Sequence, residues 1–463
     1  MCAQNDARRN LPGVDKLLER SELRAYRDRI ATPHLTRLVR EQLDSAREAL
    51  ARGKEAPDEE QLALRIVREI ERRLNSGPRR VINATGVILH TGLGRAPLSA
   101  AAIAAVADTA RYCDLEFDLE SGDRGDRQSH VESLLAWITG ADAALMVNNN
   151  AAALFLVLNS LAARREVIVS RGQLIEIGGS FRLPEIMARA GAKLIEVGTT
   201  NRTRISDFAA AVSDKTAMLL RAYPSNFRVE GFAESVEVAD LATLAHSFGA
   251  LCVDDLGGGL LWDWAKLGMP TEPHVAQSLS AGADLVLVSG DKVLGGPQAG
   301  LILGRTELVA KLKKSPLARV LRPGKLEVAA LSATLLSFLH PDRPAREVPV
   351  WSMFAEMPET TRTRADRLLS LVKGGDWAQI EVCESPAQAG SGTLPATPLP
   401  SFALALNPAR QSAARFARGL RTARTPVIAV VQNDTVLVNL RTVSDSELTE
   451  LAETILSVAD KKA

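Results

Sequence analysis

Lys292 is the residue of this sequence best placed for covalent chemistry. It follows the apolar, strand-length run Leu285–Val288 and a turn of small residues, and Gly295 and Gly296 come soon after it. Ligands bind at strand ends of α/β sheets, and a lysine removed from water there loses part of its preference for the charged form. Its amine then becomes a nucleophile, and the glycines leave room for a flat cofactor that lysine holds as a Schiff base. The alternative is a solvated lysine in a surface turn.

Two carboxylates end another predicted strand. Asp254 and Asp255 follow the apolar run that starts at Ala250, and three glycines come shortly after them. A carboxylate in this place can keep a pyridine nitrogen protonated, so that the ring draws electrons away from a substrate. We expect Asp255 to take this role, with Asp254 as the alternative. Both residues could instead cap a turn or a helix.

A third strand end offers a site for a phosphate group. The predicted strand Ala143–Val147 runs into three asparagines, of which Asn149 and Asn150 are followed by Ala151 and an apolar helix. Free backbone N–H groups and the positive end of the helix dipole bind anions at such a place. A plain helix N-cap is the alternative. Together with Lys292 the motif predicts the phosphate cup of a pyridoxal cofactor, and Ser289 is expected beside the same cofactor.

Several arginines stand where they could bind anions. Arg95 lies in a glycine turn, where its planar fork of donors can approach an anionic ligand. Arg319 and Arg322 are three residues apart and share one helix face. Arg124 and Arg127 flank a glycine in a polar loop that is either structural or phosphate-binding. For an isolated arginine pair, a solvated surface is the alternative.

Strand-like and helix-like runs alternate through the middle of the chain. The predicted strands are 143–147, 166–170, 193–197, 216–221, 250–254 and 285–288, and the helices between them include 184–190, 205–211 and 235–247. Alternation of this kind predicts an α/β fold whose mostly parallel sheet is covered on both faces.

Two smaller segments flank this central part. The first, residues 1–78, reads as a helical domain with arginine-bearing faces and a modest basic excess, which is either an ordinary charged surface or a phosphate-binding one. A proline-rich joint near residue 340 separates the central domain, 79–340, from a small α/β domain, 341–463. The last domain ends in a predicted hairpin, 427–440, and a helix that a Ser444 capping box begins.

Composition excludes several classes of protein. The 463 residues are 46% hydrophobic and 24% charged with a net charge of +1, as in ordinary globular proteins. The first ten residues lack an apolar signal core, and no apolar run is long enough for a membrane span, so we expect a cytoplasmic protein. The four cysteines lie far apart, and neither disulfides nor a metal site is predicted.

Several long motifs together resemble one family. They are Val81–Gly86, His90–Ser99, Val147–Ala153, Asp254–Gly257 and Ser289–Gly300. The chain is similar along nearly its whole length to the bacterial selenocysteine synthases, the L-seryl-tRNA(Sec) selenium transferases.

The resemblance implies an aspartate-aminotransferase-like large domain (fold type I) and a ring-shaped decamer. It implies that pyridoxal phosphate is bound by Lys292 and that Arg95, Arg319 and Arg322 hold selenophosphate. The N-terminal domain would bind tRNA(Sec). The implied reaction eliminates water from seryl-tRNA(Sec), and selenium adds to the resulting aminoacrylyl group.

Two other functions compete with this one. A related pyridoxal lyase acting on a small amino acid would not need the helical segment 11–74. A tRNA-binding protein with an inactive catalytic lobe would not need Lys292, Asp255 and the glycine turn together.

Overall fold

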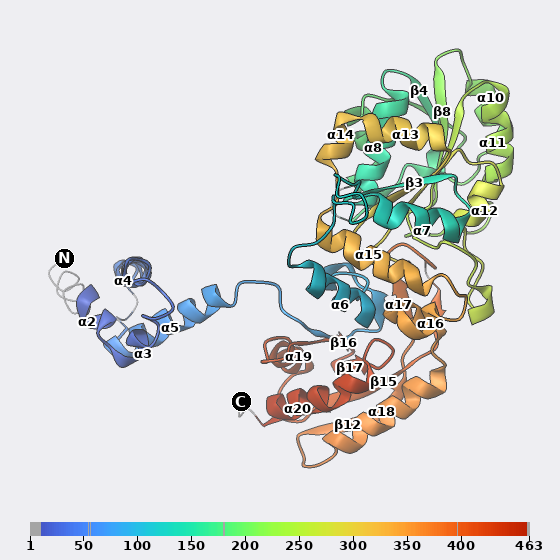
Figure 1. Ribbon diagram of the computed structural model, residues 1–463. Helices are drawn as coiled ribbons and strands as arrows, with labels where there is room; N and C mark the ends of the chain where they lie inside the picture. The colour runs from blue at the N-terminus through green and yellow to red at the C-terminus, as the bar shows by residue number, and fades with distance from the viewer. Residues whose placement is uncertain (1–10, 54, 56, 179–180, 396, 461–463) are drawn as a thin grey trace. The chain divides into compact units, whose positions relative to one another are not determined.

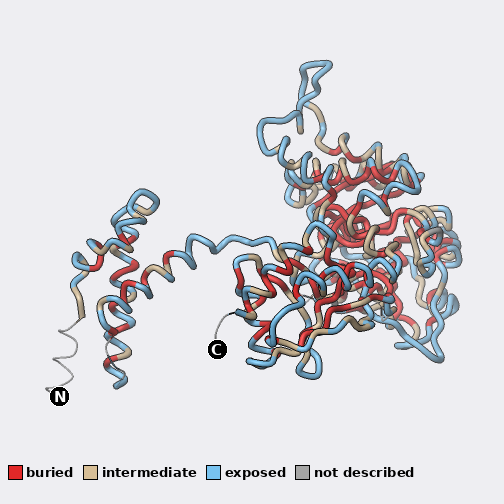
Figure 2. Tube along the Cα trace, turned by 90° about the horizontal axis from the view of Figure 1, so that it is seen from below, coloured by how far each residue is buried: buried red, intermediate tan, exposed pale blue. Residues whose placement is uncertain are grey.

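The protein is represented by a computed structural model that describes residues 11–53, 55, 57–178, 181–395 and 397–460. The chain divides into two compact units, Met1–Arg80 and Val81–Ala463 (Figure 1). Each unit has buried residues of its own, drawn in red in Figure 2. Among the described residues, no helix combines the length and the apolar character that a membrane crossing requires.

The first unit is helical where it is described. Its helices are α2 (Val14–Leu18), α3 (Ser21–Arg24), α4 (Thr32–Ala51) and α5 (Glu59–Leu74). Helix α5 is capped by Asp58, whose side chain accepts a hydrogen bond from the Gln61 amide (2.7 Å), while the Gln61 side chain accepts one from the Asp58 amide. Leucine, isoleucine and valine at helical spacing in α4 and α5 meet in one core. The charged residues of both helices are therefore left on the outside.

A seven-stranded sheet forms the centre of the second unit. In chain order its strands are β3 (Ala143–Val147), β4 (Glu166–Ser170), β7 (Lys193–Val197), β8 (Thr216–Ala222), β9 (Leu251–Asp255), β10 (Leu285–Ser289) and β11 (Gly300–Gly304). Their order across the sheet is β3-β11-β10-β9-β8-β4-β7. Only β11 runs antiparallel to its neighbours, so the mostly parallel sheet predicted from the sequence is confirmed.

Both faces of this sheet are buried. Along β10, Val286 and Val288 enter one hydrophobic core, and Leu285 and Leu287 enter the other, because successive side chains of a strand point to opposite faces. The first face is covered by α7 (Ser129–Thr139), α10 (Ile205–Ala211), α11 (Val238–Ser247), α12 (Val275–Ser280) and α15 (Lys325–Ser337). The second is covered by α8 (Asn150–Ala162), α9 (Leu183–Arg189), α13 (Thr306–Lys314) and α14 (Pro316–Val320). Helix α6 (Ala100–Thr109) packs on α15 (Figure 1).

A second sheet lies in the C-terminal part. It contains β12 (Ala378–Glu384), β15 (Phe402–Pro408), β16 (Val427–Gln432), β17 (Thr435–Asn439) and, at one edge, β1 (Ile82–Ala84) in parallel with β16. Helices α18 (Pro358–Val372), α19 (Ala413–Arg421) and α20 (Leu448–Ala459) share its core. The start of the unit thus completes a sheet built from its end.

Short elements join the two sheets. Helices α16 (Pro344–Glu347) and α17 (Pro349–Ala355) follow the large sheet in the chain, and a three-stranded sheet is formed by β14 (Pro398–Leu399), β13 (Ala387–Gly390) and β2 (Val87–Leu89). Strands β5 (Glu176–Ile177) and β6 (Phe181–Arg182) form a small hairpin. Strand β13 brings the loop that follows it to the end of β2, and this loop reaches the site described next.

Candidate active site

Lys292 lies in a cavity of about 200 Å³ just beyond the end of β10. The cavity is also lined by the predicted site residues Arg95, Asn149, Asn150, Ala151, Asp255 and Ser289. Only 5% of the Lys292 surface is exposed. Burial lowers the pKa of its amine and the nearby Arg95 charge lowers it further, while Asp255 and Asp291 act in the opposite direction. The lysine is therefore more often neutral and nucleophilic than a solvated one.

The two adjacent carboxylates at the end of β9 face different surroundings. Asp255 lines the Lys292 cavity and accepts a hydrogen bond from Asn150 Nδ2 at 2.9 Å. Asp254 is fully buried on the other side of the strand, where Arg221 donates to both of its oxygens (2.7 and 2.9 Å) and Ser278 donates at 2.6 Å. Asp255 is thus the carboxylate that faces the cavity, as alternation along a strand requires.

Burial also controls the charge of Asp255. It raises the pKa of this carboxyl from 3.8 to about 6, although the Asn150 hydrogen bond and the Lys292 charge lower it. The group keeps a hydrogen bond to the protein and stands in the same cavity as the lysine. An ionised Asp255 is consequently stabilised by any cation that enters beside it.

The start of helix α8 provides the anion site. Asn149 is the N-cap, and its Oδ1 accepts from the Ala152 amide at 2.9 Å. The first amides of a helix have no acceptor within it, and its N-terminal end carries partial positive charge. Asn149, Asn150 and Ala151 line the cavity at this end. The arrangement therefore suits a phosphate group.

Arg95 is held beside the lysine by an ion pair. Its Nη1 lies 2.7 Å from Asp291 Oδ2, and the Ser289 hydroxyl donates to the other oxygen of Asp291 at 2.8 Å. The Arg95 backbone has φ +64°, a left-handed conformation that non-glycine residues rarely adopt. Such strain persists where the surroundings fix it, which is common at functional sites.

The other predicted arginines lie outside this cavity. Arg319 is exposed on α14, and the exposed Arg322, just beyond that helix, has its Nη1 3.4 Å from Glu116 Oε1. Arg124 and Arg127 pair with the same glutamate, the first at 2.7 Å. In the described part of this single chain, none of the four lines the Lys292 cavity.

Sequence reasoning missed several further neighbours of the lysine, among them Tyr223, Phe181 and Gly392. Tyr223, just after β8, lines the cavity, and so does Phe181 of the small hairpin. Gly392, in a loop for which the sequence predicted no chemistry, packs on the lysine: a Cβ added there would lie 2.3 Å from Lys292 Cδ. The position of Tyr223 at a strand end was a usable signal, whereas the contact of Gly392 depends on a pairing between distant strands.

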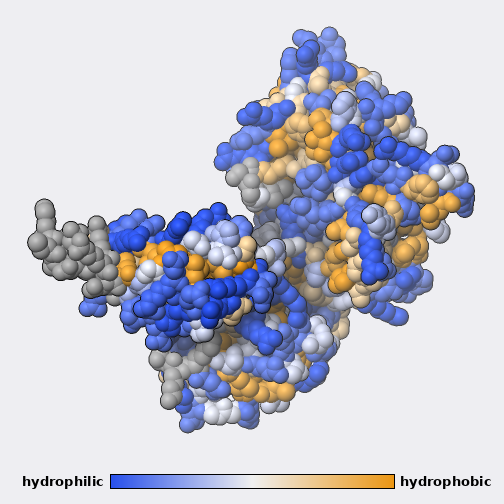
Figure 3. Space-filling model, turned by 60° about the vertical axis from the view of Figure 1, so that its left-hand side comes forward, coloured by the Kyte–Doolittle hydropathy of each residue, from blue (hydrophilic) through white to orange (hydrophobic). Residues whose placement is uncertain are grey.

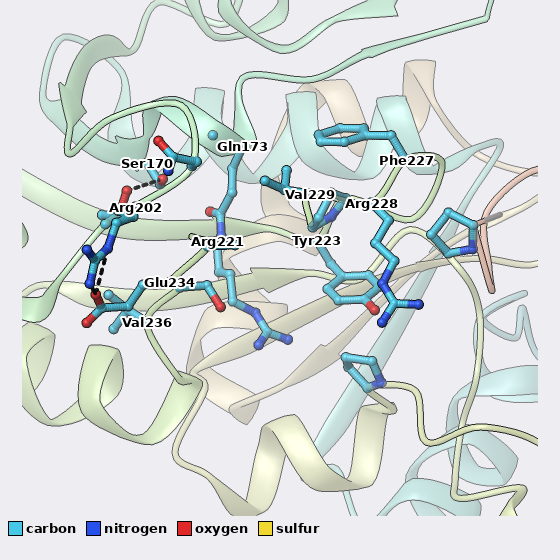
Figure 4. Close-up of a pocket in the computed structure, with 18 of the residues that line it drawn as sticks. Ser170, Gln173, Arg202, Arg221, Tyr223, Phe227, Arg228, Val229, Glu234 and Val236 are labelled. Carbon is cyan, nitrogen blue, oxygen red and sulfur yellow. Dashed lines mark hydrogen bonds and ion pairs between the residues drawn. The ribbon is translucent and has the colours of Figure 1, made fainter. Parts of the chain in front are cut away.

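A second, larger groove adjoins the first cavity. Tyr223 lines both of them, and Arg221, Arg228 and Glu234 are among the residues around the groove (Figure 4). Its volume is about 510 Å³. Arg221, which holds Asp254, has its guanidinium carbon 5.9 Å from the Tyr223 ring centre.

Comparisons with known proteins agree on the family. The family model "L-seryl-tRNA selenium transferase" matches residues 81–444, and "Selenocysteine synthase N terminal" matches residues 8–47. An L-seryl-tRNA(Sec) selenium transferase of Moorella thermoacetica is 46% identical over 460 residues, which cover 98% of this chain and 97% of that one. The enzyme of the same name from Aquifex aeolicus is 40% identical over 449 residues, 96% of this chain and 98% of its own.

A solved structure supports the architecture. D-glucosaminate-6-phosphate ammonia-lyase superposes with a TM-score of 0.58 at 17% identity, covering 84% of this chain and 98% of its own. The large domain has the aspartate-aminotransferase-like architecture, fold type I, that the sequence predicts. By the extent of the sequence match, the chain belongs to the L-seryl-tRNA selenium transferase family.

Proposed function

We infer that this chain is an L-seryl-tRNA(Sec) selenium transferase that depends on pyridoxal phosphate. It converts seryl-tRNA(Sec) to selenocysteinyl-tRNA(Sec), which agrees with the name of its relatives, L-seryl-tRNA(Sec) selenium transferase. The observation that carries this inference is that 46% identity to such a relative extends over 98% of the chain, and that the chain has a cavity with a buried lysine. Because tRNA charging and translation are cytoplasmic in bacteria, we expect the enzyme to work there.

The cavity residues fit pyridoxal phosphate. A lysine, a carboxylate and a helix N-terminus share one cavity, and these are the partners that the aldehyde, the pyridine nitrogen and the phosphate need. The Oδ1 atom of Asn150 is buried and has no hydrogen-bond partner in the described part of the chain. We assign Lys292 to the aldehyde, Asp255 to the ring nitrogen, and Asn149, Asn150 and Ala151 to the phosphate, with Ser289 beside them.

Each of these groups then has a defined task. When bound, the cofactor supplies an electron sink for the α-carbon of the seryl group. Lys292 would hold the cofactor through its amine, and this amine, whose pKa burial lowers, would be suited to accept the α-proton of the seryl group when free. Asp255 would hold the ring nitrogen in its protonated form, because an ionised carboxylate and a protonated ring stabilise each other's charge.

We assign selenophosphate binding to Arg95, Arg319 and Arg322. Arg95 already stands in the cavity, 2.7 Å from Asp291. The Leu321 carbonyl, next to Arg322, accepts a hydrogen bond from the Asn148 peptide N–H at 2.9 Å, and Asn148 directly precedes Asn149, which lines the cavity. This contact supports the assignment of the arginine pair. Two planar forks on one segment suit a tetrahedral dianion.

We assign tRNA(Sec) binding to the helical N-terminal unit. Arg37, Arg40, Arg65 and Arg68 are exposed on α4 and α5, and they form no ion pair within the part of the chain that the structure describes. Other arginines of these helices, such as Arg73, pair with glutamates. Arginines left without carboxylate partners are free to neutralise phosphates, which dominate the affinity for nucleic acids.

We further propose that the chain assembles with copies of itself, as a decamer by its family resemblance. Hydrophobic side chains gather in patches on the face shown in Figure 3. Over the described chain as a whole, the strongly exposed large hydrophobic side chains include Ile103, Tyr112, Leu119, Trp137, Val320 and Phe232. Contiguous exposed apolar patches are typical of protein interfaces.

The direct test is to incubate the purified protein with seryl-tRNA(Sec) and selenophosphate and to analyse the esterified amino acid. Selenocysteine on the tRNA is the expected product. If the tRNA keeps its serine while free small amino acids are consumed, the chain is a pyridoxal lyase instead. If neither reaction occurs although tRNA binds, the inactive, tRNA-binding alternative holds.

A further inference from the structure

Gly392 holds the backbone of the C-terminal loop against the candidate catalytic lysine. A Cβ on this residue would lie 2.3 Å from Lys292 Cδ and 3.1 Å from Nζ, so the glycine hydrogen is in contact with the lysine stem. Its φ of +94° is open to glycine and strained for other residues. On the opposite side, a Cβ on Gly258 would lie 2.6 Å from the Gly392 carbonyl oxygen. Gly392 is therefore packed between the glycine turn after β9 and the lysine.

The two ends of this loop are anchored differently. On its N-terminal side, the Ser391 amide donates to the Leu89 carbonyl at 3.2 Å, which continues the β13–β2 pairing. On its C-terminal side, Thr393 and Leu394 are 2% and 3% exposed, but no sheet continues there among the described residues. A turn hydrogen bond from the Thr397 amide to the Leu394 carbonyl (3.2 Å) holds the backbone at this second end, and one side chain also reaches it.

That side chain is Glu272. It accepts a hydrogen bond from the Thr393 hydroxyl (Oγ1–Oε2 3.5 Å), and the Leu394 amide and the Tyr223 hydroxyl lie close enough to lower the pKa of its carboxyl. Burial raises the pKa of this carboxyl, as expected where a charged group has given up water for protein donors. One carboxylate thus joins the loop to an aromatic residue that lines the lysine cavity.

Tyr223 is itself tied to the strand ends. Its backbone amide donates to the Asp255 carbonyl at 2.8 Å, and its ring lies beside the Arg228 side chain in the groove (Figure 4). Arg228 also attracts the Glu272 charge. The connection runs from Asp255 through Tyr223 and Glu272 to the loop that covers the lysine.

We propose that Glu272 is a positioning residue, which clamps the 391–395 loop and Tyr223 so that Gly392 stays packed on Lys292 and keeps its amine directed into the cavity. This rests on the proposed function in one respect, the assignment of Lys292 as the cofactor-binding lysine. Glu272 contacts neither cofactor nor substrate in this role. Without the clamp, the loop leaves the lysine, and both cofactor retention and turnover decrease.

The test compares Glu272→Ala with Glu272→Gln, Thr393→Val and the control Glu234→Ala. Glu234 lines the same groove, but its carboxylate pairs with Arg202 (2.8 Å), away from the loop. For Glu272→Ala we expect faster hydrogen exchange at amides 391–395, at least tenfold faster loss of the cofactor's visible absorption on dilution, and a lower kcat with unchanged KM for seryl-tRNA. Glu272→Gln should recover part of each effect, and Thr393→Val should affect the loop with the fold intact.

The proposal is wrong if, in Glu272→Ala and Thr393→Val, hydrogen exchange at amides 391–395 and cofactor retention equal those of the wild type or of Glu234→Ala. It is also wrong if kcat falls without any change at amides 391–395. Failure of the wild type to bind pyridoxal phosphate would instead refute the proposed function. Hydrogen exchange still tests the role of Glu272 in that case, because the measurement requires no cofactor.

Discussion

Replacing Asp255 by asparagine should stabilise the cofactor-free protein and weaken cofactor binding. The folded-state pKa of this carboxyl lies above its ordinary value, about 6 against 3.8, chiefly through burial. Folding therefore favours its protonated form, and the stability that this provides is complete below about pH 3.8 and is lost as the pH rises through about 6. An asparagine side chain in its place would have the shape of the protonated form at every pH.

The magnitude follows from the shift. At 1.36 kcal/mol per pKa unit, the ionised carboxylate costs about 3 kcal/mol near pH 8 and about half of that near pH 5. Asp255→Asn should raise the unfolding free energy of the cofactor-free protein by up to this amount near pH 8, less as the pH falls. Denaturant titrations at several pH values measure the gain. Equilibrium titration with pyridoxal phosphate should show weaker binding, because the ring nitrogen loses its anionic partner.

Asp254→Asn is the matched control. The neighbouring carboxylate is fully buried but accepts both donors of Arg221 and the Ser278 hydroxyl. Removing its charge leaves the arginine unpaired, so this variant should be destabilised by several kcal/mol, on the order of 3–5. If Asp255→Asn is destabilised near pH 8 as Asp254→Asn is, or binds the cofactor as tightly as the wild type, the account of Asp255 is refuted.

Three further predictions concern other parts of the site. Deletion of residues 1–75 should abolish tRNA(Sec) binding in a gel-shift assay and leave the cofactor's visible absorption unchanged; retained tRNA binding would contradict the assignment of the N-terminal unit. In denaturant titrations, the unfolding free energy of Arg95→Gly should exceed that of Arg95→Ala by up to about 1 kcal/mol, because a φ of +64° is open to glycine and strained for alanine; equal unfolding free energies would argue against backbone strain. Arg319→Ala should raise the KM for selenophosphate with little effect on cofactor or tRNA binding, and an unchanged KM would remove it from the donor site.

The sequence predicted the central elements well because their signals are local. The helix expected at 205–211 and the strands expected at 143–147, 166–170 and 193–197 have the predicted bounds. Some boundaries were less accurate. The helix expected at 235–247 begins only at Val238, because the backbone of Glu237 is still extended (φ −72°, ψ 152°).

Contacts between distant segments could not be predicted in the same way. Whether Asp254 or Asp255 faces the cavity depends on the register of β9, which the apolar pattern of a strand buried on both faces does not reveal. The 391–395 loop reaches Lys292 only because β13 pairs with β2, about three hundred residues earlier in the chain. The edge position of β1 in the C-terminal sheet depends on a similar long-range pairing.

The most direct test of the central assignment is to reduce the cofactor-loaded protein with borohydride, digest it, and locate the modified lysine by mass spectrometry. Borohydride makes the bond between a lysine and pyridoxal phosphate permanent. The account predicts one cofactor-derived mass increase, on the peptide that contains Lys292, and no increase at that position in Lys292→Ala. Modification of a different lysine, with Lys292 unmodified, would contradict it.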